Sequence, residues 1–161
     1  MVFDDCIKKI CDCYSETEKV LLELEEEINY LFICDPDEVF ITNEKITQYR
    51  QMADELMTTA YEICSEDSTG ILLKAADPQC CRADIDDRAE NVFTARQDIN
   101  AVLFRIQNVI PQVEKRISVE KDKSIEKIRD NNTSQSANVS KYFSTILGDN
   151  NQFTMKKNRS I

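Results

Sequence analysis

The chain has 161 residues, with 30 Asp or Glu, 20 Lys or Arg, two glycines, no histidine and a formal net charge of −10. A chain of this length is typical of one ordinary domain, and two glycines are too few for the turns of a β-sandwich or barrel, so the many helix-forming residues predict an all-α fold. Because histidine is the commonest general base and metal ligand, and because no nucleophile with a nearby base or glycine-rich phosphate loop is evident, we expect no enzyme activity.

The first segment carries an apolar heptad pattern. From Phe3 to Leu31, apolar residues alternate spacings of four and three over four heptads, and only Thr17 interrupts them. Such a pattern is typical of a helix that packs along one face against other helices. It predicts a helix over about residues 3–33.

A turn and a second helix are predicted directly after it. Asp35 suits the N-cap position, Pro36 suits the first helical position, and Glu38 lies three residues beyond the cap, as in a capping box. The apolar spacing then predicts a helix over about residues 36–64, with Asn43 as a polar residue in its apolar face. A turn this short joins two helices as an antiparallel hairpin.

The third region is less regular. The polar sequence SEDSTG ends the second helix, and a short helical piece is predicted around residues 71–76, ended by an Asp-Pro pair. Asp84 is expected to cap a longer helix over about residues 84–129. Pro111 lies inside that helix, where a missing N–H and a steric clash predict a kink or a break.

The predicted fold class is therefore an all-α, elongated antiparallel helical hairpin or three-helix bundle with coiled-coil heptads. Residues 1–129 form the predicted bundle, and residues 130–161 form a polar tail that we expect to be flexible, because it holds few large apolar residues. Two shorter helices cannot cover the whole third helix, so its distal part should expose an apolar stripe, and such a stripe usually marks a binding surface. The apolar residues of the tail recur at helical spacing, which favours a short binding helix, although a frayed terminus remains the alternative. The predicted partner-binding residues are Ile117, Val119, Ile125, Ile128, Val139, Tyr142, Phe143, Ile146, Leu147 and Phe153.

Cofactors, membranes and nucleic acids are not expected. The seven cysteines are an odd number without zinc-site spacing, so we expect reduced thiols that fill the core, no metal and no cofactor. The cluster of Asp84, Asp86 and Asp87 is interpreted as helix-capping rather than cation-binding. No apolar run is long enough for a membrane span, and the N-terminus lacks a signal-peptide core, so a cytoplasmic protein without membrane insertion is predicted. No concentrated basic patch suggests nucleic-acid binding.

Two segments carry a resemblance to a known family. They are CDPDEVFITNEKITQYRQMADEL at residues 34–56 and NNTSQSANVSKYFSTILGDNNQFTMKK at residues 131–157. Both resemble segments of the small all-helical flagellar export chaperones of the FlgN type, particularly those of clostridial relatives. The resemblance implies a cytosolic chaperone that binds the C-terminal helical segments of hook–filament junction proteins and hands them to the export gate of the type III export apparatus.

Two other interpretations remain open. A structural or scaffolding coiled coil would use the same exposed apolar stripe to self-associate, for example as a homodimer. A small regulator that responds to a thiol signal would depend on the cysteines alone. Light scattering over a range of concentrations, with and without a client helix, separates a chaperone from a scaffold.

Overall fold

The computed structural model describes residues 2–134, and within this range it contains helices and turns but no β-strand. The predicted all-α fold class is confirmed. The elements in chain order are α1 (Phe3–Ile33), η1 (Pro36–Glu38), α2 (Val39–Ser65), α3 (Ile71–Ala76), η2 (Arg82–Asp84), η3 (Asp87–Ala89) and α4 (Glu90–Ser134), where η marks a single 3₁₀ turn.

The chain divides into two compact units, Met1–Ile117 and Ser118–Ile161, although α4 passes from one into the other as one helix. The sequence predicted a bundle up to residue 129, whereas the first unit ends at Ile117. Residues 130–134, predicted as the start of the tail, belong to α4. The rest of the predicted tail lies outside the described residues.

Helix α1 begins and ends where its heptad pattern predicts. The buried residues at Ile10, Leu24 and Ile28 follow the predicted spacing of the apolar face. Thr17, the one polar residue in the pattern, is fully buried, and its hydroxyl donates a hydrogen bond of 2.7 Å to the carbonyl of Cys13. Because the hydroxyl is satisfied within its own helix, it can occupy the core without an unpaired polar group.

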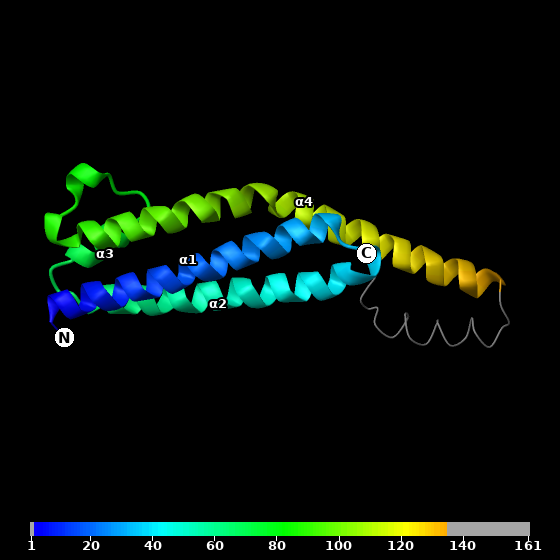
Figure 1. Ribbon diagram of the computed structural model, residues 1–161, viewed down its shortest axis with the longest axis horizontal. Helices are drawn as coiled ribbons and strands as arrows, with labels where there is room; N and C mark the ends of the chain where they lie inside the picture. The colour runs from blue at the N-terminus through cyan, green and yellow to red at the C-terminus, as the bar shows by residue number, and fades with distance from the viewer. Residues whose placement is uncertain (1, 135–161) are drawn as a thin grey trace. The chain divides into compact units, whose positions relative to one another are not determined.

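Helices α1 and α2 form the predicted antiparallel hairpin, in which α2 runs back along α1 (Figure 1). The turn differs in detail from the expectation. Asp35 occupies the N-cap position of η1, but its carboxylate makes no capping hydrogen bond. Glu38 does not complete a capping box either, because its Oε1 instead accepts a 2.5 Å hydrogen bond from the phenol of Tyr30. The first turn of the predicted second helix is therefore the 3₁₀ turn η1, and the α-helix proper begins at Val39.

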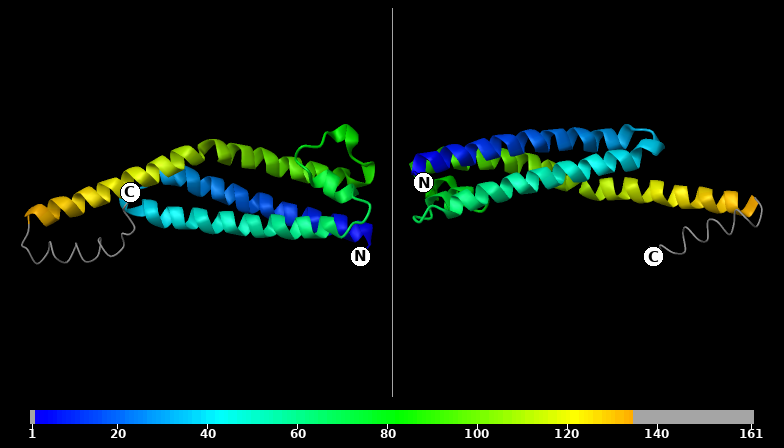
Figure 2. Two further views of the ribbon diagram at one scale, coloured as in Figure 1. Left: turned by 180° about the vertical axis from the view of Figure 1, so that it is seen from behind. Right: turned by 90° about the horizontal axis from the view of Figure 1, so that it is seen from below.

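The part of α4 in the first unit completes a three-helix arrangement. It runs beside the hairpin in the same direction as α1 (Figures 1 and 2). Val92, Ile99, Ile106 and Val113 are spaced by seven residues, are all buried, and belong to the same hydrophobic core as the apolar residues of α1 and α2. The long-range heptad packing predicted for the third helix is thus present within this unit.

Pro111 does not break α4, which is continuous from Glu90 to Ser134. The sequence predicted a kink or a break at this residue, and the break does not occur. Figure 2 shows the ribbon of α4 curving in its yellow-green part. Curvature of this kind is the usual response of a helix to an internal proline, which has no N–H to offer the carbonyl four residues earlier.

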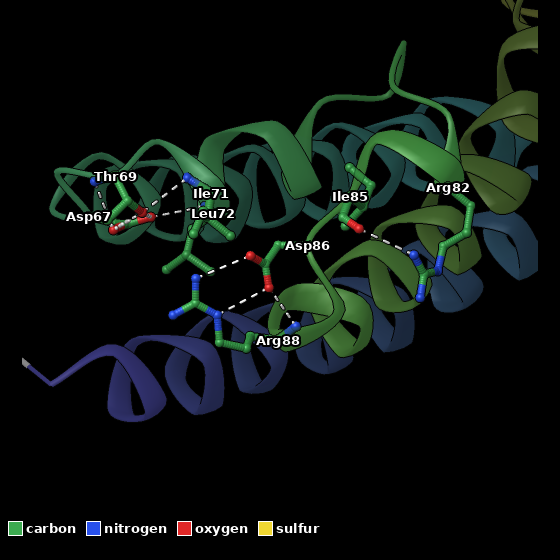
Figure 3. Close-up of polar contacts among 8 residues, drawn as sticks. All are labelled: Asp67, Thr69, Ile71, Leu72, Arg82, Ile85, Asp86 and Arg88. Atoms are coloured by element: carbon green, nitrogen blue, oxygen red, sulfur yellow. Dashed lines mark hydrogen bonds and ion pairs between the residues drawn. The ribbon is translucent and has the colours of Figure 1, made fainter.

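The connection between α2 and α3 is held by one carboxylate. Asp67 accepts hydrogen bonds from the backbone N–H of Thr69 at 3.1 Å and of Leu72 at 3.0 Å, as well as from the hydroxyl of Thr69 (Figure 3). These bonds lower the pKa of Asp67, the side-chain bond from Thr69 having the largest effect. Gly70 precedes α3 with φ of 76°, a left-handed conformation that glycine adopts without strain.

The N-terminal approach to α4 is capped by Asp86 rather than by Asp84. The carboxylate of Asp86 accepts a 2.8 Å hydrogen bond from the backbone N–H of Arg88 and also pairs with its guanidinium (Figure 3). That guanidinium lies over the ring of Phe3, 5.2 Å from its centroid, so it also contacts the first turn of α1. The predicted capping role of Asp84 is therefore wrong, because Asp84 ends the turn η2, Asp86 caps the turn η3, and α4 itself begins only at Glu90.

An ion pair joins α4 to the C-terminal third of α1. Arg105 donates to Glu25 through Nε at 2.8 Å and through Nη2 at 2.9 Å, a bidentate geometry. The hydrogen bond from Arg105 is the largest cause that holds the pKa of Glu25 below its ordinary value. Only the ionised carboxylate can accept both bonds.

This pair predicts a pH-dependent contribution to stability. Since the folded-state pKa of Glu25 lies below its unfolded value, the contribution is present above the unfolded pKa, about 4.3, and is lost as the pH falls through the folded pKa. Glu25→Gln should therefore lower the Tm by about 1–4 °C at neutral pH, and the difference from the wild type should shrink as the pH falls below about 4. Thermal unfolding followed by circular dichroism over a pH series checks this. Glu26→Gln, at the exposed neighbouring position, is the control, and an undiminished difference at the lowest pH would contradict the assignment.

Candidate functional site

The predicted partner-binding residues fall into three groups. Ile117, which the sequence left without an intramolecular partner, is half-buried and packs against the core of the first unit. That expectation is corrected, because the compact unit extends to this residue. In the described part of the second unit, Val119 is exposed, and Ile125 and Ile128 are half-buried. The remaining six predicted residues, Val139, Tyr142, Phe143, Ile146, Leu147 and Phe153, lie outside the described residues.

A different set of exposed apolar residues surrounds the turn between α1 and α2, and sequence reasoning did not identify it. We call this set the turn cluster. Its most exposed members are Ile33 and Ile41, whose relative exposures are 80% and 63%. The complete set is Tyr30, Phe32, Ile33, Phe40 and Ile41. The sequence did contain a sign of this cluster, because these residues are apolar but do not fall on the heptad positions that form the buried faces of the helices.

A groove of about 340 Å³ lies beside two members of the cluster, and we call it the turn groove. Its lining residues come from both helices and from η1: Glu27, Tyr30, Glu38, Ile41, Thr42 and Lys45. The bond from the Tyr30 phenol to Glu38 fixes one wall of the groove, and this bond is the largest cause that raises the pKa of Tyr30 to about 12. The groove therefore combines an apolar surface from Ile41 with carboxylates from two elements.

The stretch of chain that forms the turn groove is strongly anionic. Between residues 20 and 44 the chain holds eight acidic residues and no Lys or Arg. Among these, Glu25 is paired with Arg105. The eight are Glu23, Glu25, Glu26, Glu27, Asp35, Asp37, Glu38 and Glu44. Lys45 is the one cationic side chain among the residues that line the groove.

The turn itself is fixed by a residue from α4. Arg116 donates hydrogen bonds to the carbonyl of Leu31 through Nε at 3.2 Å and to the carbonyl of Cys34 through Nη2 at 3.1 Å. These carbonyls lie at the C-terminal end of α1, where backbone acceptors have no partner within the helix and where a positive charge is favourable. Arg116 thus ties α4 to the end of α1, beside the turn cluster.

No metal centre is formed by the described residues, among which no three side chains of the ligand types Cys, Asp and Glu come together in a suitable arrangement. In the aspartate cluster that the sequence interpreted as helix-capping, Asp86 pairs with Arg88, and Asp87 pairs with Arg82 at 3.3 Å. These carboxylates neutralise arginines and help to close the loop that leads into α4.

The seven cysteines carry free thiols. Burial is the largest cause that raises the pKa of Cys64 to about 11, and it also raises the pKa values of Cys11 and Cys13. Because the thiolate is the reactive form, a raised pKa makes these thiols less reactive at neutral pH. Their environment favours a packing role over a thiol-responsive one.

Within the described range, no helix combines the length and the apolar character that crossing a bilayer requires. Comparison of the chain with protein-family models, with curated proteins and with solved structures finds no match.

Proposed function

We propose that this chain is a non-catalytic, cytoplasmic helical chaperone that binds amphipathic helices of other proteins. The observation that carries the proposal is the turn cluster, in which Ile33 and Ile41 are largely exposed next to the packed core of the first unit. Burial of one such side chain by a partner is worth about 1.5–3 kcal/mol. A group of exposed apolar residues at one end of a packed helical unit is typical of a protein-binding surface.

The resemblance to flagellar export chaperones of the FlgN type suggests the client. By that resemblance, the chain binds the C-terminal helical segments of hook–filament junction proteins and delivers them to the export gate during flagellum biogenesis. Amphipathic helical segments of this kind can dock their apolar faces on exposed apolar side chains of a helical bundle. In this proposal Val119, Ile125 and Ile128 remain candidates for a second contact, as do the predicted residues of the tail.

Isothermal titration of the full chain with a synthetic C-terminal helical peptide of a hook–filament junction protein tests this function. We expect saturable binding of one peptide per chain. A peptide of the same composition in scrambled order, which has no apolar face, should give no binding. Equal heats from the two peptides, or no heat from either, would contradict the proposal.

The alternative function is a scaffold that self-associates through its exposed apolar residues. The two functions differ in how the molar mass depends on concentration. A chaperone without its client should keep one mass in light scattering across the concentration range, set by the chain mass of 18.6 kDa. A mass that rises steadily with concentration would favour the scaffold.

A further inference from the structure

We infer that the turn groove is the docking site for a lysine-rich amphipathic helix, whose apolar face covers Ile41 and Tyr30 and whose ammonium groups reach Glu27 and Glu38. The inference deepens the proposed function and rests on it in one respect, namely that the chain binds helical segments. It adds the place of binding and the chemical character of the partner.

The apolar part of the argument comes from the position of Ile41. This side chain lines the groove and is 63% exposed, and Tyr30 lines the same groove with 42% of its surface exposed. Ile33, at 80%, lies three residues after Tyr30 on α1, a spacing that places the two residues on neighbouring parts of the helix surface. A helix with apolar residues three and four positions apart presents a stripe that matches such a surface.

The electrostatic part of the argument comes from the two sides of the groove. Glu27 belongs to α1 and Glu38 to η1, so carboxylates reach the groove from two different elements. Lys45 offsets one of these charges, whereas residues 20–44 contribute eight acids and no base. A cationic partner would therefore be attracted at long range and paired at contact, and salt should weaken the attraction.

The same charges argue against other occupants. A second copy of the chain that docked through the same surface would bring its own Glu27 and Glu38 against these carboxylates, and like charges oppose that association. Nucleic acids and anionic lipid surfaces carry the same sign of charge and would also be repelled. Charge complementarity thus selects a cationic helix.

The groove is already arranged for binding. The Tyr30 phenol holds Glu38 in place through its hydrogen bond, and Arg116 holds the end of α1 through its bonds to Leu31 and Cys34. Preorganised groups lose little conformational freedom when the partner arrives, so more of the contact energy appears as affinity.

Fluorescence anisotropy with the full chain and two designed peptides tests the inference. Both peptides are helices of about 18 residues, roughly 27 Å long, with leucines at the same positions, and they carry either lysines or glutamates on the polar face. We expect saturable binding of the lysine peptide, with a Kd that rises between about 50 and about 200 mM salt, and no binding of the glutamate peptide. Ile41→Ala should weaken binding of the lysine peptide at least about tenfold, and Glu38→Gln should weaken it and reduce its salt dependence.

Tyr61→Ala is the matched control. Tyr61 lies on the same helix as Ile41, towards its other end, and is 62% exposed, so its replacement should leave the affinity unchanged. Ile41 and Tyr61 are exposed and Glu38 is half-buried, none of the three belongs to the core, and circular dichroism of each variant checks that the helices remain. Equal binding of both peptides, an unchanged affinity in Ile41→Ala, or an equal loss in Tyr61→Ala would overturn the inference. A dimer of the wild type that Ile41→Ala dissociates would assign the groove to a second copy and would also overturn it.

The outcome is separable from that of the proposed function. If the lysine helix binds at the groove and the junction-protein peptide does not bind, the docking site stands and the proposed client is wrong. If the junction-protein peptide binds with an affinity that Ile41→Ala and Glu38→Gln leave unchanged, the proposed function stands and the docking site is wrong.

Discussion

Leu24→Ala is expected to lower the free energy of unfolding by about 2–5 kcal/mol, because it removes a fully enclosed side chain and leaves a cavity. Leu24 lies on the buried face of α1, is only 1% exposed, and belongs to the core that α1, α2 and α4 share. The helices around Leu24 are held by their other core contacts, so they cannot move inward far enough to fill the cavity completely. Urea denaturation followed by circular dichroism measures the loss.

Glu26→Ala provides the control for this loss. Glu26 lies two residues further along α1, where its side chain is exposed, and its replacement should change the free energy of unfolding by no more than about 0.5 kcal/mol. If the urea midpoints of the two variants shifted equally, the buried face of α1 would be wrongly assigned.

Pro111→Ala is expected to act in the opposite direction and to raise the free energy of unfolding by about 1–3 kcal/mol. Pro111 is exposed and lies inside a continuous α-helix, where proline is about 3 kcal/mol less favourable than alanine. Alanine would supply the N–H that the carbonyl of Gln107 lacks in the present helix. The gain can be as small as about 1 kcal/mol because an alanine helix would tend to straighten, and the core residues of α4 pack in its present, curved form.

The measurement is again urea denaturation, with Glu114→Ala as the control at a nearby exposed position of α4. That variant should shift the free energy of unfolding by no more than about 0.5 kcal/mol. A loss of stability in Pro111→Ala would show that the packing of Val113 and of its neighbours requires the bend.

Periodicity and local chain chemistry were sufficient to predict that the three long helices exist and in which order they come, although α4 begins at Glu90 and not near residue 84, and ends at Ser134 and not near residue 129. The residues of α1 from Phe3 to Ile33 carry one unbroken spacing, so both the ends of this helix and its buried face followed from the sequence. The single polar residue in that spacing, Thr17, could be kept inside the helix because a threonine hydroxyl can reach the carbonyl four residues earlier. Such interactions join residues that are close in the sequence, so they can be predicted from the sequence pattern alone.

The capping residues were harder to predict because several carboxylates compete for each position. Asp84, Asp86 and Asp87 are equally suitable by type, and in the structure Asp86 is the one that accepts from the N–H of Arg88, whose guanidinium also lies over the ring of Phe3. That contact joins the beginning of α1 to the approach to α4, and nothing local in the sequence specifies it.

The candidate site was missed for a related reason. Sequence reasoning looked for exposed apolar residues where one helix exceeds the length of its partners, which led to Ile117 and the residues after it. Ile33 and Ile41 are apolar residues outside the heptad positions, so the sequence alone could have drawn attention to them. Whether such a residue is buried or exposed depends on the geometry of the turn. The geometry in turn depends on Arg116, whose bonds to Leu31 and Cys34 span 85 and 82 positions.

The position of Arg116 also has a consequence for the order in which the fold is completed. During synthesis from the N-terminus, the hairpin of α1 and α2 can form early, but the donor for the carbonyl of Cys34 is added 82 residues later. A turn that is short in sequence is thus completed by one of its most distant contacts. The amide of Cys34, which donates to the carbonyl of Tyr30 at 2.8 Å, should then exchange its hydrogen with the cooperative opening of the whole unit rather than with the fraying of a helix end.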